Sequence, residues 1–200
     1  LLRHGNGILI PNIQRDYAQG RQDAGELRER FVGDLHRALT LPGATLDLDF
    51  VYGSEPEEAD AFLPLDGQQR LTTLLLLHWY LAIKHDRGRD FRALALRGDK
   101  ARFTYEVRPT SEDFFDALIK HKLAPFPPVD EQKGDVLSRT LSDQYWYYLS
   151  WKHDPTIAGC LTMLDAIHNE FGGDPAEPDL YERLTRKQSP RITFQFLNLD

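Results

Sequence analysis

Two short loops that carry glutamine and arginine hold the residues best suited to chemistry in this chain. The second loop, residues 65–73, reads Leu-Asp-Gly-Gln-Gln-Arg-Leu-Thr-Thr and precedes a strongly apolar stretch over residues 74–83. Amide groups, a planar guanidinium fork and hydroxyls are all able to bind phosphate oxygens. The candidate phosphate-binding residues of this loop are Gly67, Gln68, Gln69, Arg70, Thr72 and Thr73.

The position of this loop before an apolar helix favours anion binding. The first N–H groups of a helix lack partners inside the helix and carry the positive end of its dipole, so they attract phosphate. Gly67 lets a ligand approach the backbone because it has no Cβ. An alternative stays open, in which Asp66 and Gly67 form a turn and helix cap and Arg70 pairs with a surface carboxylate.

A second polar cluster follows the first expected strand. Residues 8–11 read as a short strand that ends at a proline, and residues 12–17 read Asn-Ile-Gln-Arg-Asp-Tyr. Here too a strand leads into a loop with adjacent glutamine and arginine, namely Gln14 and Arg15, followed by Tyr17. We therefore expect the two loops to meet at one end of a small sheet.

Together, Ile10-Pro11-x-x-Gln14-Arg15-x-Tyr17 and the Asp-Gly-Gln-Gln-Arg-Leu-Thr-Thr run over residues 66–73 resemble the signature of the N-terminal domain of GmrSD-type restriction systems. The fold of that family is similar to the ParB and sulfiredoxin superfamily. The resemblance covers essentially the whole chain. Further segments that carry it are residues 62–65, 77–82, 103–106 and 151–164.

The resemblance implies a cytoplasmic, nucleotide-binding and NTP-hydrolysing domain of a bacterial defence protein that restricts modified phage DNA. It implies a nucleoside triphosphate with Mg²⁺ as cofactors, DNA as the partner of the full-length protein, and a separate C-terminal nuclease domain or subunit. We expect the chain to be a fragment truncated at its C-terminus, which can be inactive by itself. Assembly into a homo-oligomer stays open.

The resemblance also implies roles for individual residues. Arg15, Gln68, Gln69, Arg70 and the helix N-terminus would hold the phosphates, which makes electrostatic stabilisation the main catalytic effect. Asp66 is the first candidate for holding Mg²⁺ or orienting water, with Asp16 in reserve. The predicted catalytic residues are Asp66, Gln69 and Arg70, and the predicted nucleotide-binding residues are Gln14, Arg15, Tyr17, Gly67, Gln68, Thr72 and Thr73.

Three other functions remain as alternatives. The same loops could bind DNA backbone phosphate without hydrolysis, which predicts a steep salt dependence. They could also cut DNA directly, as in some ParB-like nucleases. A purely structural or partner-binding role is the third alternative, and it predicts that loop substitutions change stability alone.

Composition and charge restrict the classes of protein. The net charge of −7 argues against a domain that holds DNA by overall charge. Residues 84–108, however, contain eight Lys or Arg and four Asp or Glu, so this segment could face a phosphate backbone or simply be a solvated surface. The single Cys160 excludes an internal disulfide, and the longest apolar run is too short for a membrane span.

Hydrophobic periodicity predicts an α+β fold with its strands mostly early and its helices mostly late in the chain. The resemblance implies that the early part is a small ParB/sulfiredoxin-like mixed sheet with helices, followed by a mainly helical region. The expected division is residues 1–124, which carry both loops, and residues 125–200, a helical extension of the same domain. Alternating apolar residues predict strands, and spacings of three and four predict helices. The expected strands cover residues 46–52, 102–108 and 192–196, and the expected helices residues 26–39, 68–85, 110–121, 135–151, 155–171 and 180–187.

Overall fold

The structure is a computed structural model, and it describes residues 7–11, 16–56, 61–106, 108–122, 126–129, 134–176 and 178–199. Most of the predicted site residues lie within these ranges. Gln14 and Arg15 of the first loop lie outside the described residues.

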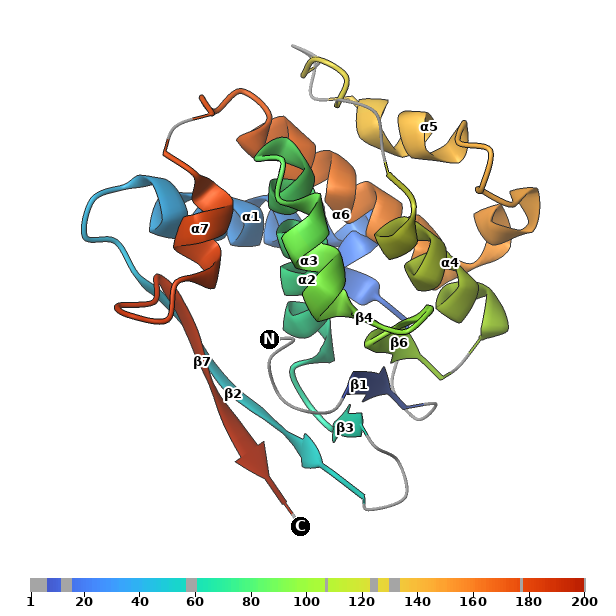
Figure 1. Ribbon diagram of the computed structural model, residues 1–200, viewed down its shortest axis with the longest axis horizontal. Coiled ribbons are helices and arrows are strands. Elements are labelled where there is room, and N and C mark those ends of the chain that lie inside the picture. Colours follow the sequence, from blue (N-terminus) through green and yellow to red (C-terminus); the bar gives the residue numbers. More distant parts are fainter. Residues whose placement is uncertain are drawn as a thin grey trace.

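A mixed five-stranded sheet with the order β6-β1-β3-β2-β7 forms one side of the molecule (Figure 1). β1 runs parallel to both β3 and β6, whereas β2 is antiparallel to β3 and parallel to β7. The carboxyl ends of β6, β1 and β3 therefore open on the same edge. The strands are β1 (Gly7–Ile10), β2 (Leu46–Ser54), β3 (Ala61–Pro64), β6 (Phe103–Tyr105) and β7 (Ile192–Asn198), and a separate hairpin pairs β4 (Leu96–Arg97) with β5 (Lys100–Ala101).

Helices fill the rest of the molecule, and α1, α2, α6 and α7 lie together on the side away from β1 and β3 (Figure 1). Within the described ranges, no helix has the length and apolar character needed to cross a membrane. The α-helices are α1 (Gly25–Thr40), α2 (Gln68–Lys84), α3 (Gly88–Ala95), α4 (Pro109–Lys120), α5 (Val136–Ser142), α6 (Pro155–Phe171) and α7 (Leu180–Thr185), and the 3-10 turns are η1 (Ala18–Gly20), η2 (Gln22–Ala24) and η3 (Leu149–His153).

The predicted α+β class, with a mixed sheet and a mainly helical later region, is confirmed. Helices occur where they are predicted over residues 26–39, 68–85, 155–171 and 180–187. The start of α6 follows its sequence signal closely, because the Asp154 carboxylate accepts hydrogen bonds from two N–H groups of the first turn.

Two helix predictions are corrected by the structure. Residues 135–151 do not form one helix: α5 ends at Ser142, and a 3-10 turn begins only at Leu149. The intervening chain turns so that Trp146 and Trp151 become buried, with Trp151 packed edge-on against Phe114 at 5.6 Å between ring centroids. Burial of these aromatic rings outweighs the local helical pattern.

The second correction is smaller: the helix predicted over residues 110–121 begins one residue earlier, at Pro109. Proline suits the first helical position because its missing N–H would have no partner there. The hydroxyls of Thr110 and Ser111 donate to Asp154, 2.6 and 2.9 Å away.

One hydrophobic core unites the two parts of the chain. The buried cluster includes residues on both sides of position 125, such as Ile10 from β1 and Leu164 from α6. The first loop reaches α6 through two glycines, since a Cβ on Gly20 would collide with the backbone of Gly159. This close backbone approach fixes the end of the first loop against the helical layer.

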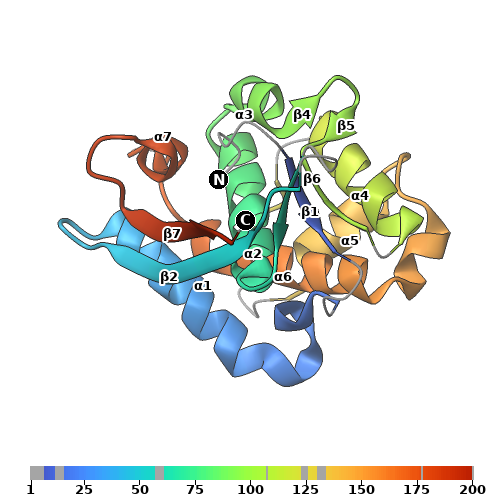
Figure 2. The ribbon, with the colours of Figure 1, turned by 90° about the horizontal axis from the view of Figure 1, so that it is seen from below.

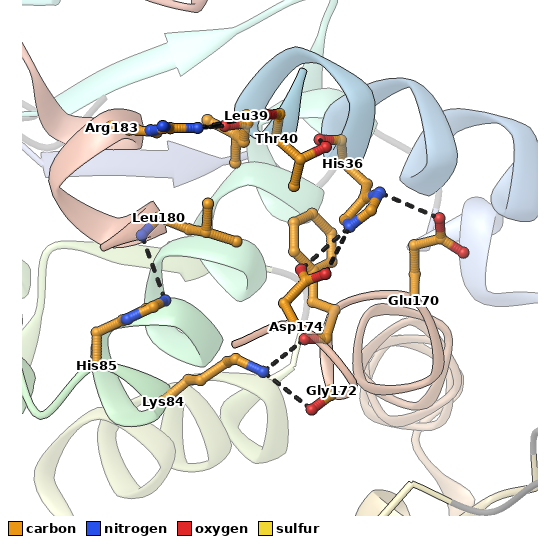
Figure 3. Close-up of polar contacts among 11 residues, drawn as sticks. His36, Leu39, Thr40, Lys84, His85, Glu170, Gly172, Asp174, Leu180 and Arg183 are labelled. Atoms are coloured by element: carbon orange, nitrogen blue, oxygen red, sulfur yellow. Dashed lines mark hydrogen bonds and ion pairs between the residues drawn. The ribbon is translucent and has the colours of Figure 1, made fainter. Parts of the chain in front are cut away.

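Polar contacts fasten α7 to α1 and α2 before the chain returns to the sheet as β7 (Figure 3). Arg183 donates to the carbonyl oxygen of Leu39 at 2.8 Å, and the N–H of Leu180 lies 3.3 Å from His85 Nε2. Nearby, His36 Nε2 lies 3.0 Å from a carboxylate oxygen of Asp174. These contacts set the position from which β7 reaches β2.

Candidate functional site

The candidate site lies where β6, β1 and β3 end on one edge of the sheet (Figure 2). The loop after β3 leads into α2, and the segment after β6 leads into α4, so two helix N-termini lie at this edge. Ligands of open α/β sheets bind outside the carboxyl ends of the strands. The two N-termini add positive potential, which favours an anion.

Gln69 joins the second loop to the described part of the first. Its Oε1 accepts hydrogen bonds from the N–H groups of Ala18 and Gln19, at 2.8 and 3.1 Å, and its Nε2 donates to the carbonyl oxygen of Asp16 at 3.2 Å. The structure therefore brings the two loops together. Both ends of the Gln69 amide are engaged with the first loop, which gives this side chain a positioning role.

Three more predicted binding residues are buried and support the start of α2 from inside. Tyr17, Thr72 and Thr73 have no exposed surface. The Tyr17 hydroxyl lies 2.6 Å from Thr73 Oγ1, and Thr72 Oγ1 lies 2.8 Å from the hydroxyl of Tyr105. Burial raises the pKa of Tyr17 well above its ordinary value, so the phenol stays neutral. These hydroxyls hold the first turn of α2 and do not face solvent.

The guanidinium of Arg70 is anchored on strand β2. It donates to the carbonyl oxygens of Leu48 and Phe50, the latter at 2.8 Å, and to Asp66 Oδ2 at 3.0 Å. The side chain is 24% exposed, whereas that of Asp66 is 51% exposed. Arg70 thus holds α2 against β2. It also pairs with the carboxylate of Asp66, and pairing of Arg70 with a surface carboxylate is the alternative that the sequence left open.

Gly67 is required by the geometry at the start of α2. Its φ of 88° lies in the left-handed region, and an added Cβ would stand 2.8 Å from Val51 Cγ2. As the N-cap residue, Gly67 provides no side-chain acceptor for the first turn of α2. Gln68, the first residue of the helix, is partly exposed at this edge.

Arg108 is a residue of this edge that the sequence does not single out. Its Nη1 lies 2.8 Å from Asp16 Oδ1 and 3.5 Å from Asp154 Oδ1, and its side chain is 36% exposed. It stands directly before Pro109 at the start of α4. In the sequence it is only the last residue of the basic segment 84–108 and of the expected strand over residues 102–108. Arg108 is an accessible cation of the edge that binds carboxylates and no backbone carbonyl among the described residues.

The described residues contain no cluster of three or more His, Cys, Asp or Glu that could hold a metal ion. Mg²⁺ commonly binds through one or two carboxylates together with substrate phosphates and water. The partly exposed carboxylates of Asp66 and Asp16, both at this edge, suit that mode of binding. The donor set thus fits a metal that arrives with a phosphate ligand.

The fold and this edge define a mixed α/β domain whose polar loops follow parallel strands. The chain belongs to the family of N-terminal domains of GmrSD restriction endonucleases, whose sequence model matches residues 1–193. Membership in this family indicates a role in a restriction system. Comparison with curated proteins and comparison with solved structures give no match. The similarity to ParB and sulfiredoxin therefore stays a prediction.

Proposed function

We propose that this chain binds and hydrolyses a nucleoside triphosphate at the edge where β6, β1 and β3 end, as the N-terminal domain of a restriction protein that acts on modified foreign DNA. A C-terminal nuclease part would cut the DNA. The observation that supports the proposal best is the convergence of three strand ends and two helix N-termini on an edge with two carboxylates and an accessible arginine.

The exposed groups of the edge are the ones that would contact the nucleotide. The N–H groups at the start of α2 and the Arg108 guanidinium would bind phosphate oxygens, and Gln68 would add an amide. Asp66 would orient the attacking water, held in place by its contact with Arg70. Mg²⁺, when bound through Asp66 or Asp16, would neutralise phosphate charge. Gln14 and Arg15 would complete the pocket from the first loop.

The groups that connect the two loops would act indirectly. Gln69, Thr73 and Tyr17 hold the two loops in register, so they would fix where the phosphates sit. Such positioning matters because phosphoryl transfer depends mainly on orientation and electrostatic stabilisation.

Calorimetric titration with ATP, GTP and UTP in the presence of Mg²⁺ tests the proposal. We expect Arg108→Ala to weaken nucleotide binding by about tenfold or more, since loss of one charge-assisted hydrogen bond exceeds roughly 1.4 kcal/mol. Asp66→Asn should retain binding and lose hydrolysis. Arg186→Ala is the matched control, because Arg186 makes an exposed ion pair with Glu182 within α7 and its C-cap.

The result that would contradict the proposal is a wild-type protein that binds none of the three nucleotides. Equal affinities of Arg108→Ala and Arg186→Ala would also contradict it, because Arg108 would then not contact phosphate.

A further inference from the structure

A concave site lies away from the strand edge, beside α3. A cavity of about 850 Å³ is enclosed by the end of α2, by α3, by the end of α4 and by residues 126–129. α2 has 17 residues, so at about 1.5 Å per residue its last turn lies roughly 24 Å from its first residue, Gln68. The cavity is therefore separate from the proposed nucleotide site, and its volume is typical of a ligand pocket.

The cavity has an aromatic wall. Phe126 stacks on Tyr80 with ring centroids 4.5 Å apart and planes 6° from parallel, and Trp79 lies 6.0 Å from Phe126. Tyr80 and Trp79 are buried, whereas Phe126 is only partly buried. The indole N–H of Trp79 donates to the carbonyl oxygen of Leu118, so its polar atom is satisfied inside the protein. This wall suits a planar ring that stacks on Phe126.

The rim of the cavity is cationic. Arg89 and Arg92 on α3 and Lys122 after α4 line it, and none of these three side chains makes a hydrogen bond or ion pair with a described residue. Among the described lining residues, Asp86 is the single carboxylate. Three cations without an anionic partner among the described residues, placed around an aromatic wall, suit a ligand that is both anionic and planar.

Lys84 has a different role in the same cavity. Its Nζ donates to the carbonyl oxygens of Phe171 and Gly172, at 2.6 and 2.9 Å (Figure 3). Burial lowers the pKa of Lys84 below its ordinary value. Lys84 thus joins α2 to the end of α6 and fixes one wall.

We infer that this cavity binds one unstacked nucleotide of a DNA strand, with its base against Phe126 and the flanking phosphates on Arg89, Arg92 and Lys122. The net charge of −7 means that DNA is not held by overall charge, so its contacts have to be local. Two arginines of the basic segment 84–108 lie at this rim. The cations belong to two separate elements, which suits successive phosphates of a strand better than the single phosphate of a free nucleotide.

The inference rests on the restriction family for the choice of DNA and is independent of NTP hydrolysis. An unstacked base fits a cavity that a stacked base cannot enter, and removing a base from the stack costs a few kcal/mol. Single-stranded DNA avoids that cost. We therefore expect single strands to bind more tightly than a matched duplex.

Fluorescence anisotropy with a labelled single-stranded oligonucleotide tests this inference. The double variant Arg89→Glu/Arg92→Glu should lose about tenfold or more in affinity, and the slope of log K against log salt should fall by about 1.4, or roughly 0.7 for each lost phosphate contact. Arg30→Glu on α1 is the control charge reversal, because Arg30 does not line this cavity, and it should change neither quantity.

The aromatic wall is tested without changing the protein. An oligonucleotide of abasic residues keeps the phosphates and should bind at least about fivefold more weakly than the normal strand, because it cannot stack. Inorganic phosphate and a nucleoside monophosphate should compete only weakly with the strand.

Equal DNA affinity of the double variant and Arg30→Glu would overturn the inference, and so would equal affinity for the normal and abasic strands. Competition by a nucleoside monophosphate at the affinity of the strand would also overturn it in favour of a small-ligand pocket. Calorimetric ATP titration of the same variants separates this test from the proposed function, because the double variant should bind nucleotide as the wild type does.

Discussion

Replacement of Arg70 by alanine should destabilise the fold, because the guanidinium is a clamp between α2 and β2. It makes hydrogen bonds to the carbonyl oxygens of Leu48 and Phe50. A hydrogen bond with a charged donor contributes about 1.5–3 kcal/mol. Leu48 is buried, whereas Phe50 is 47% exposed, so water replaces the donor more readily at Phe50. We therefore expect Arg70→Ala to lower the free energy of unfolding by about 2–4 kcal/mol.

Two matched variants separate the parts of this interaction. Asp66→Ala removes only the ion pair to Arg70, which involves a carboxylate that is 51% exposed, so it should cost no more than about 1 kcal/mol. Arg70→Lys keeps the charge but lacks the planar fork that reaches two carbonyls, so it should restore less than half of the loss. Urea unfolding followed by circular dichroism measures all three variants.

One result would refute the clamp. If Arg70→Ala unfolds at the same urea concentration as the wild type but loses nucleotide affinity, the guanidinium acts on the ligand and not on β2. If the variant loses stability, nucleotide binding has to be compared at a temperature where both proteins are fully folded. Asp66→Ala, which should keep its stability, is then the cleaner test of chemistry at this loop.

Two further predictions concern a backbone position and a buried histidine. Gly67→Ala should cost about 1–3 kcal/mol more than Gly43→Ala in urea unfolding, since both glycines have positive φ but only Gly67 would place a Cβ 2.8 Å from Val51; equal losses would exclude the clash. Burial lowers the pKa of His168 from its ordinary 6.5. As the pH falls, the unfolded chain therefore takes up the proton before the folded protein does. The free energy of unfolding should be highest above about pH 6.5 and should fall below it by up to about 1.4 kcal/mol per pH unit. His168→Gln should flatten this fall, and an unchanged pH profile would assign it to other groups.

The elements that the sequence predicts correctly are those whose local signals agree with their packing. α6 is the clearest case, because Asp154 caps it, Pro155 suits its first position and its apolar residues recur at helical spacing. In β2, by contrast, the alternation predicted over residues 46–52 shifts at a bulge between Asp47 and Phe50, so that Phe50 and Tyr52 are exposed and Val51 is buried. The strand over residues 192–196 alternates as its sequence predicts, like the helical spacing of α6. Local pattern and tertiary burial point to the same structure at these places.

Other elements depend on partners that are distant in the chain. The helical pattern over residues 135–151 breaks because Trp151 packs on Phe114 and other aromatic rings of the core. α3 lies in a segment that reads as basic and polar, and it is not among the helices expected from the sequence. Its apolar residues Phe91, Leu94 and Ala95 do have helical spacing, but the helix is only eight residues long, so packing against α2 is needed to stabilise it.

At the candidate site, the sequence shows which types of residue are present but not the role of each one. The sequence identifies both polar loops, and the structure places Gln69 of one against residues 16–19 of the other. The sequence does not reveal that Thr73 and Tyr17 are buried against each other, because the two residues lie 56 positions apart in the chain. Arg108 escapes notice for the same reason, since its carboxylate partner Asp16 lies 92 positions away.

The second loop contains many polar residues because the fold needs them, whether or not a ligand binds. Arg70 satisfies carbonyls of β2, Gln69 satisfies backbone groups of the first loop, and Thr73 bonds to Tyr17. A buried polar group without a partner costs about 1–3 kcal/mol, so these residues are required as a set. A relative that binds no ligand at this edge would still need them in order to fold. The motif alone therefore indicates this fold, and activity has to be judged at the exposed groups of the edge, Asp66 and Arg108.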